Sequence, residues 1–422
     1  MRQRKAVLAG QVKRWRKATK AEKSVILDHI VAVNGWHRDH ARKMMRLAVA
    51  GVDVNSPRKK RAPVHRYSQE VIDALVVCWA VLDGPSGKIL QPALPALVPR
   101  LIACGDLDCT PNVETQLLAI SAATIDRRLK PYRTGLAGSL KPRSLTRPGS
   151  LLKSSIPLKT WHEWDDRIPG FIEIDLVGHD GGDNNGEFHF SLDAVDVATG
   201  WTETISVKSK GERIITQAIS DLRLLFPFPI LGIHSDNGSE FINWHLLHWC
   251  ENNQVTFTRG RANHSNDQAH IEQRNWTRVR RNVGYYRYDT PRELALLNQL
   301  WPLVSVLTNL YTPQQRLQSK TRQGAKVTKI YDTPASPATR LLRDHPGSIN
   351  TTDTKLLQQQ LAQTNPAQLR RDIDLIQRNL LELARRRGAT TRRAKRNHIY
   401  LSKTKTIRAS SHESTNQTKR AI

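Results

Sequence analysis

Three carboxylates of this 422-residue chain stand where regular elements can hold them firmly. Asp175 falls in FIEIDLVGH, where apolar and acidic residues alternate as in a strand, so its carboxylate faces away from the apolar stripe. Asp236 follows the apolar run 230–233 at an Asn-Gly turn, which predicts the C-terminal end of a strand. Glu272 lies in NDQAHIEQRNWTRVRRN, which has helical periodicity.

Carboxylates on such elements provide the oxygen ligands that hard divalent cations such as Mg²⁺ and Mn²⁺ require. A pair of these ions can stabilise the attacking and the leaving oxygen of a phosphodiester. The alternative is that each acid is only a capping, turn or solvated residue, and the spacing by itself does not exclude this. The order of elements around the acids, with two strands and a helix that can converge, favours the metal site.

The blocks SDNGSEF and NDQAHIEQRNW, together with the order Asp175, Asp236, Glu272, resemble the DDE transposase and retroviral integrase superfamily. The most similar members are bacterial insertion-sequence transposases with an integrase-type core. The resemblance covers about residues 170–288. It implies a ribonuclease-H-like core, metal-dependent cutting and joining of DNA, and Asp175, Asp236 and Glu272 as the catalytic ligands of Mg²⁺ or Mn²⁺, two ions in all.

A polar insert, HDGGDNNGE at residues 179–187, departs from the family pattern. It adds Asp180 and Asp183 as competing ligands, which we reject because a Gly- and Asn-rich loop holds a carboxylate less firmly than a strand. Three nearby histidines are expected to be structural or to contact DNA, since this chemistry needs carboxylates: His234, His264 and His270.

The chain carries 65 Lys and Arg against 38 Asp and Glu, a net charge of +27. This excess favours a polyanionic partner, first of all double-stranded DNA. A ribosome-like or membrane-surface protein is the alternative, and the acidic triad argues against both. Because no apolar run approaches the roughly 18 residues that span a bilayer, we expect no membrane partner and a cytoplasmic bacterial protein, associated with the nucleoid when bound to DNA. The cysteines lack zinc-site spacing and read as reduced thiols.

The segments before the core are expected to bind DNA. Residues 21–33 and 38–49 flank Asn34-Gly35 in a helix-turn-helix pattern, with a basic second helix; the alternative is a helical hairpin with a solvated face. A later helix, 119–130, is capped by Ser121 and is the better recognition-helix candidate. The expected contacts in these two helices are Arg38, Arg42, Arg46, Thr124, Arg127 and Arg128.

On the helix of Glu272, Arg274, Arg278 and Arg281 fall at positions i, i+4 and i+7 and are expected to hold phosphates next to the metals. The alternative is a solvated basic stripe. Within the core, we expect a strand hairpin over 187–207 and helices over 211–226 and 243–252. After the core, 316–342 is basic and broken by prolines, and 356–387 forms a helical pair that could contact a second protomer.

The expected fold is therefore multidomain: all-α helix-turn-helix units, a central α/β core with a mixed five-stranded sheet and helices, and a helical, basic C-terminal region. The expected parts are residues 1–55 and 67–133 as DNA-binding units, 56–66 and 134–160 as basic linkers, 161–290 as the core, 291–384 as a helical region and 385–422 as a basic tail.

These features predict a DNA transposase that binds the ends of its element and target DNA, and that assembles as a homo-oligomer on DNA. One alternative is a nuclease that cuts without joining. Another is a DNA-binding regulator whose core has lost activity, against which the three intact acids speak.

Overall fold

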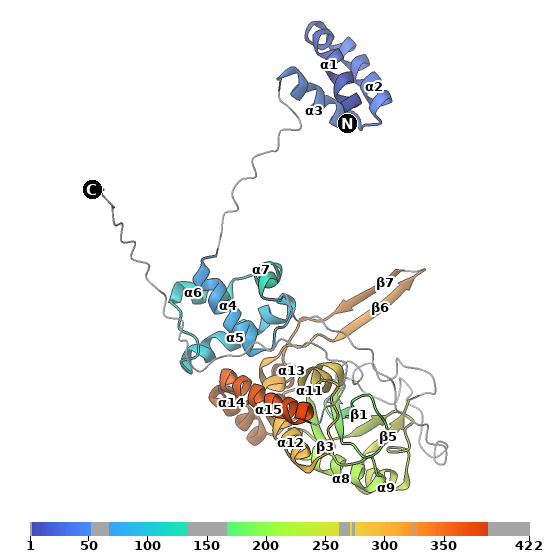
Figure 1. Ribbon diagram of the computed structural model, residues 1–422, viewed down its shortest axis with the longest axis vertical. Helices are drawn as coiled ribbons and strands as arrows, with labels where there is room; N and C mark the ends of the chain where they lie inside the picture. The colour runs from blue at the N-terminus through green and yellow to red at the C-terminus, as the bar shows by residue number, and fades with distance from the viewer. Residues whose placement is uncertain are drawn as a thin grey trace, which may run out of the picture. The chain divides into compact units, whose positions relative to one another are not determined.

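The computed structural model describes residues 2–51, 67–133, 167–260, 271, 275–324 and 326–386. The chain divides into two compact units, residues 1–66 and 67–422 (Figure 1). The division falls at the end of the basic linker expected at 56–66. Both expected linkers and the basic tail beyond residue 386 lie outside the described residues.

The first unit is helical. It consists of α1 (Arg2–Lys17), α2 (Lys20–Asn34) and α3 (Arg38–Val49), and the break between the last two is made by Gly35, whose φ of 65° favours glycine. The helix pair expected around Asn34-Gly35 is confirmed. Helix α1 was not predicted. The three helices share a small apolar core: Leu8, Ile26, Leu27, Ile30, Ala41 and Met45.

The second unit begins with a bundle of short helices, α4 (Gln69–Val81), α5 (Gly87–Ala103), α6 (Pro111–Leu118) and α7 (Ala122–Leu129), followed by the 3₁₀ turn η1 (Lys130–Arg133). Helix α4 is largely buried. Helix α7 starts where expected, since the Ser121 side chain accepts a hydrogen bond from the Thr124 N–H. Helix α5 contains Pro92, Pro95 and Pro99, which lie on its outer side while leucines fill its buried side.

The core is a mixed five-stranded sheet, as expected. Its strands are β1 (Phe171–Gly178), β2 (Phe190–Asp196), β3 (Thr202–Val207), β4 (Gly232–Ser235) and β5 (Thr256–Arg259), in the order β3-β2-β1-β4-β5. Strand β2 is antiparallel to both neighbours, whereas β4 and β5 run parallel to β1. The carboxyl ends of β1 and β4 therefore meet at one edge of the sheet.

Helices cover this sheet and protect its edge. Helix α8 (Glu212–Arg223) buries Ile215, Ala218, Ile219 and Leu222, but it ends before Leu225, which is 45% exposed and not inward as expected. Helix α9 (Trp244–Asn252) packs against β5, and α12 (Pro291–Val306) against β3. The amides of Asn298 and Asn309 bond the N–H and C=O groups of Ser206 and Thr202. These two side chains occupy backbone groups of the edge strand β3, which limits pairing with another chain.

The C-terminal part contains the π-helix η4 (Leu307–Tyr311), β6 (Leu317–Gln323), β7 (Lys326–Tyr331), α13 (Pro337–Asp344), α14 (Thr351–Gln363) and α15 (Pro366–Arg386). The expected helical pair split at Asn365-Pro366 is confirmed. Helix α15 packs on α12 and buries Ile373, Leu380 and Ala384 within the chain, whereas Leu356 and Leu375 of the helical pair are exposed, so contact with a second protomer stays a prediction. No described helix is long and apolar enough to cross a membrane.

Side-chain bonds join the helical bundle to the rest of the second unit. Arg281 of α11 (Arg281–Val283) forms an ion pair with Asp83, with 2.7 Å between Nε and Oδ2. Arg371 of α15 pairs with Asp106 at 2.7 Å between Nη1 and Oδ1. The bundle that was expected to be a separate DNA-binding unit is therefore attached to the core-bearing unit at both α11 and α15.

We predict that Glu293→Ala lowers the free energy of unfolding of the second unit by about 1–3 kcal/mol. The fully buried Glu293 carboxylate accepts bonds from the N–H groups of Asp289 and Thr290 and from the Thr290 hydroxyl, and Ala leaves these donors without it. Calorimetry with resolved transitions would measure the loss. Glu22→Ala, at the exposed capping box of α2, is the matched control and should disturb only the first unit, and less strongly. Equal effects of both changes would contradict this reading of α12.

Candidate active site

Asp175 and Asp236 lie side by side at the carboxyl ends of two neighbouring parallel strands. The register of β1 with β4 pairs Glu173 with His234, and its continuation by two residues brings Asp175 beside Asp236. Both side chains are partly exposed, so a ligand can reach them. The strand positions expected for these two acids are confirmed, and the sheet brings the two residues together.

The surroundings of both acids oppose ionisation. Burial, and then repulsion by Asp236, raise the pKa of Asp175 to about 7, against hydrogen bonds from the Leu176 N–H and the Asn275 amide. Burial raises the pKa of Asp236 to about 6; the Gly238 N–H, 2.8 Å from its Oδ1, acts in the opposite direction, while the Glu240 carboxylate adds to the increase. Two adjacent carboxylates in a poorly solvated place are stabilised by a cation between them.

Oxygen atoms without donors surround the pair. Among the described residues, the buried Oε2 of Glu240 and Oδ1 of Asn275 have no hydrogen-bond partner. A Cβ at Gly238 would come within 2.9 Å of Oδ1 of Asp236 and 2.8 Å of Cδ of Glu240, so only glycine lets these acids approach so closely. An oxygen-rich, donor-poor place suits a hard cation. The described residues nevertheless contain no cluster of three or more His, Cys, Asp or Glu that could hold a metal ion.

Glu272 and Arg274 lie outside the described residues, as do His264 and His270. The residues on either side of Glu272 contact β1. The N–H of Ile271 donates to Oε2 of the buried Glu173 at 3.1 Å, and the amide of Asn275 donates to Oδ2 of Asp175 at 2.5 Å. The segment of Glu272 is thus bonded to the acidic side of β1 at both of its described ends. Sequence reasoning singled out neither Asn275 nor Glu240; the signal for Glu240 was its place in the SDNGSEF turn.

Arg278 corrects the expectation of an exposed arginine stripe. Its side chain is 2% exposed and lies in η3 (Asn275–Arg280), a π-helix that contacts β1 and β2. The guanidinium donates to the hydroxyls of Thr204 at 3.0 Å, Thr308 at 3.3 Å and Ser305, and to the Trp301 carbonyl. The carboxylates of Glu203 and Asp193 partly offset the decrease that burial causes in its pKa.

The physical reason is that Arg278 adjoins Val279 on the inward face of this helix, so its charge is neutralised inside the protein. Arg281 is the other described member of the expected stripe, and its ion pair with Asp83 also lies within the chain. Neither side chain is arranged as a solvated phosphate contact.

The expected DNA contacts of the helical segments differ in their surroundings. Arg38 ties α3 to α2 through Ser24 and Asp28, and Arg42 pairs with Asp39 at 2.9 Å, whereas Arg46 is exposed. In α7, the exposed Arg127 donates to the Thr124 hydroxyl at 3.1 Å, and Arg128 is partly exposed.

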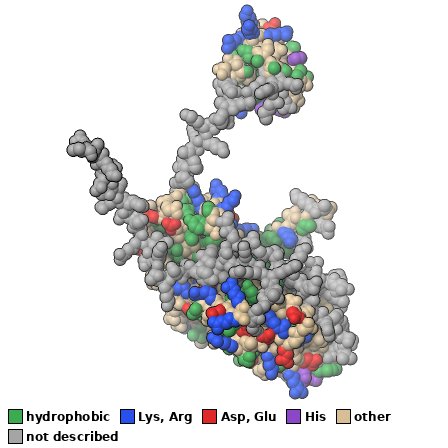
Figure 2. Space-filling model, in the orientation of Figure 1, with side chains coloured by type: hydrophobic (Ala, Val, Ile, Leu, Met, Phe, Trp, Pro, Cys, Tyr) green, Lys and Arg blue, Asp and Glu red, His purple; other side chains and the backbone are tan. Residues whose placement is uncertain are grey.

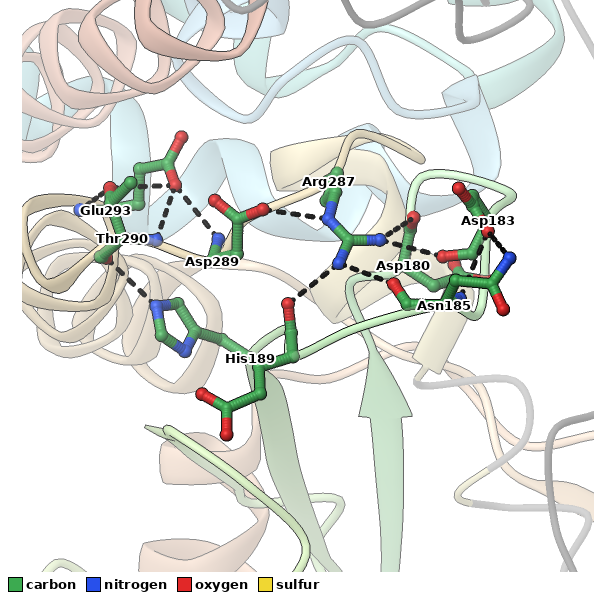
Figure 3. Close-up of polar contacts among 9 residues, drawn as sticks. Asp180, Asp183, Asn185, His189, Arg287, Asp289, Thr290 and Glu293 are labelled. Carbon is green, nitrogen blue, oxygen red and sulfur yellow. Dashed lines mark hydrogen bonds and ion pairs between the residues drawn. The ribbon is translucent and has the colours of Figure 1, made fainter.

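The insert after β1 is more firmly held than its composition suggested. Figure 3 shows the guanidinium of Arg287 donating to carbonyls of this loop and to the carboxylate of Asp289. The exposed Asp183 carboxylate accepts bonds from Asn185 inside the loop. A loosely held loop is therefore not the reason to reject Asp180 and Asp183 as metal ligands. The better reason is that Asp175 lies beside Asp236, which brings two carboxylates together. His234 bonds the Thr258 hydroxyl at 2.9 Å in the buried core, consistent with a structural role.

Known proteins offer little independent information on this site. No family model matches the chain. The uncharacterized protein y4rM of Sinorhizobium fredii is 38% identical over 329 residues, which are 78% of this chain and 92% of that protein. The crystal structure of the catalytic core domain of BIV integrase is 16% identical, with a TM-score of 0.27, and the match covers 42% of this chain and 96% of that one. The similarity to the integrase core is too low to establish a fold or an activity.

We predict that Asp175→Asn stabilises the metal-free protein increasingly as the pH rises. The pKa of Asp175 is about 7 in the folded chain and 3.8 is its ordinary value, so ionisation costs folded-state stability between these two pH values, and Asn avoids that cost. Urea unfolding in a chelator should show little difference near pH 4 and a gain on the order of 1–3 kcal/mol at pH 8. The control, exposed Asp183→Asn, should show no such trend. A gain that is constant with pH would contradict the prediction.

We predict that Arg278→Gln lowers the free energy of unfolding by about 3–5 kcal/mol, because it leaves Glu203 and Asp193 buried without their cation. Arg281→Gln is the matched control; its ion pair is 28% and 30% exposed and should cost about 1 kcal/mol or less. Adding Glu203→Gln to the Arg278 variant should recover part of the loss in a double-mutant cycle. Equal losses for the two arginines would show that burial of Arg278 does not matter.

Proposed function

The chain belongs to the same family as the uncharacterized protein y4rM of Sinorhizobium fredii, and we propose that it is a metal-dependent DNA transposase with a ribonuclease-H-like core. The observation that supports this most is the pair Asp175 and Asp236 at adjacent strand ends, where burial and like charge raise the pKa of Asp175 to about 7. A pair of acids in this state is suited to bind a divalent cation.

The proposed ligands are Asp175 and Asp236 with Glu272 as the third. The cofactor is Mg²⁺ or Mn²⁺, two ions in all, which would stabilise the charge on the attacking and leaving oxygens of a phosphodiester. The two bonds that the described neighbours of Glu272 make to Glu173 and Asp175 support its assignment.

The chain's own groups fix the carboxylates for this task. The Leu176 N–H holds Oδ1 of Asp175 at 2.7 Å, and the Gly238 N–H holds Oδ1 of Asp236 at 2.8 Å, so each acid keeps one orientation. Lys210 is close enough to lower the pKa of Asp236 and can stabilise an approaching phosphate. Orientation by groups that are already in place reduces the reorganisation needed when the scissile phosphate arrives.

DNA is the proposed substrate, both as element ends and as target. The net charge of +27 supports a polyanionic partner. We assign base reading to the helix-turn-helix pair α2–α3 and to α7, where Arg42, Arg46, Arg127 and Arg128 retain exposed surface. Arg274 remains a proposed phosphate contact, and assembly of two or more protomers on DNA remains part of the proposal.

A nuclease that cuts without joining is the alternative, because the same carboxylates would serve both reactions. The joining of a freed 3′ end to target DNA distinguishes a transposase from such a nuclease. A regulator without activity is disfavoured, since it has no need of paired acids that destabilise the fold.

We predict that Asp236→Asn abolishes cutting and joining of duplex DNA that carries the sequences flanking the gene, and that wild type needs Mg²⁺ or Mn²⁺. The amide is a poorer ligand for a hard cation. Glu272→Gln should behave alike, and both variants should retain DNA affinity in titrations. Asp183→Asn in the insert is the control and should cut as wild type does. Undiminished cutting by the Asp236 variant, or cutting by wild type in a chelator, would refute the metal-dependent mechanism.

A further inference from the structure

The hairpin of β6 and β7 is a two-stranded ribbon that extends from the second unit without a third strand (Figure 1). Every described side chain from Leu317 to Tyr331 is exposed, including Val327 at 44% and Ile330 at 53%. An isolated two-stranded hairpin is at best marginally stable in water. Exposed apolar surface on such an element indicates a binding site more than a structural part.

The sequence of the ribbon is basic throughout. Residues 316–331, RLQSKTRQGAKVTKIY, contain five Lys or Arg and no Asp or Glu. The register sets Lys320 directly opposite Lys329, and like charges at opposite positions destabilise a strand pair. No ion pair joins Lys329 to an acid in the described part of the chain. A polyanion that lies along the ribbon would remove this repulsion.

The base of the ribbon, in contrast, is rigidly attached. Arg316 donates to the Ala198 carbonyl at the β2–β3 turn, and its N–H donates to Oδ1 of Asp332. Oδ2 of Asp332 accepts a bond of 2.9 Å from Arg340, which is 2% exposed and also donates to the Gln314 carbonyl. The isolated bridge between Gln314 and Ala335 closes the base. The orientation of the ribbon is thus fixed relative to the sheet that carries Asp175.

We propose that the β6–β7 ribbon enters the major groove of the double-stranded DNA that the chain binds, an inference that rests on the proposed function. A major groove about 12 Å wide admits a two-stranded ribbon, and seven residues extend about 23 Å, more than its depth of about 8.5 Å. The cations neutralise phosphates at the groove edges. The opposed Thr321 and Thr328 offer hydroxyls to base edges, and Ile330, on the same face of the ribbon as Thr328, offers apolar contact to thymine methyl groups.

Figure 2 shows both hydrophobic and basic side chains on the described part of the ribbon. A second copy of this chain could instead pair with its open strand edges. The charge decides between the two partners, because two copies would bring ten cations together and no acid, whereas DNA supplies the opposite charge.

The test removes the charge of the ribbon from the full chain. The ribbon variant combines Lys320→Gln, Arg322→Gln, Lys326→Gln and Lys329→Gln, and the control variant combines Arg343→Gln, Lys355→Gln, Arg385→Gln and Arg386→Gln, all at exposed sites outside it. Both lose the same charge. We expect the ribbon variant alone to bind duplex DNA more weakly, with a slope of log affinity against log salt reduced by up to about 0.9 per lost phosphate contact. We expect the melting temperature of the ribbon variant to equal that of the wild type, because no described ribbon side chain is buried. An unchanged melting temperature would exclude misfolding as the cause of weaker binding.

A photoreactive residue in place of Thr328 identifies the partner directly. Cross-linking to duplex DNA supports the proposal, and cross-linking to a second copy of the chain overturns it. A ribbon variant with the wild-type salt slope also overturns it. The proposed function fails separately, through the carboxylate variants and the chelator, because those change cutting and leave the salt slope of binding as it was.

Discussion

The buried guanidinium of Arg278 is the interaction on which the arrangement of the proposed catalytic segment depends. It joins η3 to β3, α12 and η4 in a place from which water is excluded, through Thr204, Ser305, Thr308 and the Trp301 carbonyl. Because an unpaired charge is very costly there, moving η3 away from this position would leave the cation and its acids unsatisfied. Arg278 therefore helps to hold the segment that begins at Asn275, and with it the contact to Asp175.

The same sheet therefore carries two pairs of acids with opposite surroundings. Asp193 and Glu203 have the cation of Arg278 beside them, and Asp193 also accepts a 2.7 Å bond from the Thr204 hydroxyl. Asp175 and Asp236 have partial exposure and mutual repulsion, and no arginine is among the groups that stabilise their charges. Asp175 and Asp193 are even direct neighbours in the β1–β2 register. The protein neutralises one pair by itself and not the other, which is a physical criterion for a functional site.

Local patterns in the sequence predicted the elements that local physics determines. Three features could be predicted because each depends on neighbouring residues: the alternation in β1, the Asp-Asn-Gly turn after β4 and the Ser121 cap of α7. Helix α5 was not predicted, since each of its three prolines lacks the N–H of a helical hydrogen bond, and only the packing of its buried leucines, which is not a local pattern, favours the helix. The β6–β7 hairpin was not predicted because its strands mix cations and polar residues with few apolar ones, without a clear period of two, and none of its described side chains is buried.

The errors about arginines have a common cause. The net charge of the chain favours a polyanionic partner. The role of each single cation, however, depends on the acids that lie near it in space. Arg38, Arg278 and Arg281 looked like contacts for DNA, yet each has an acid of this chain within reach, often distant in sequence. Residues 316–331 have none among themselves, and their strands are separated from the rest of the fold except at the base. Cations that have no acid near them in space are the stronger candidates for contact with DNA.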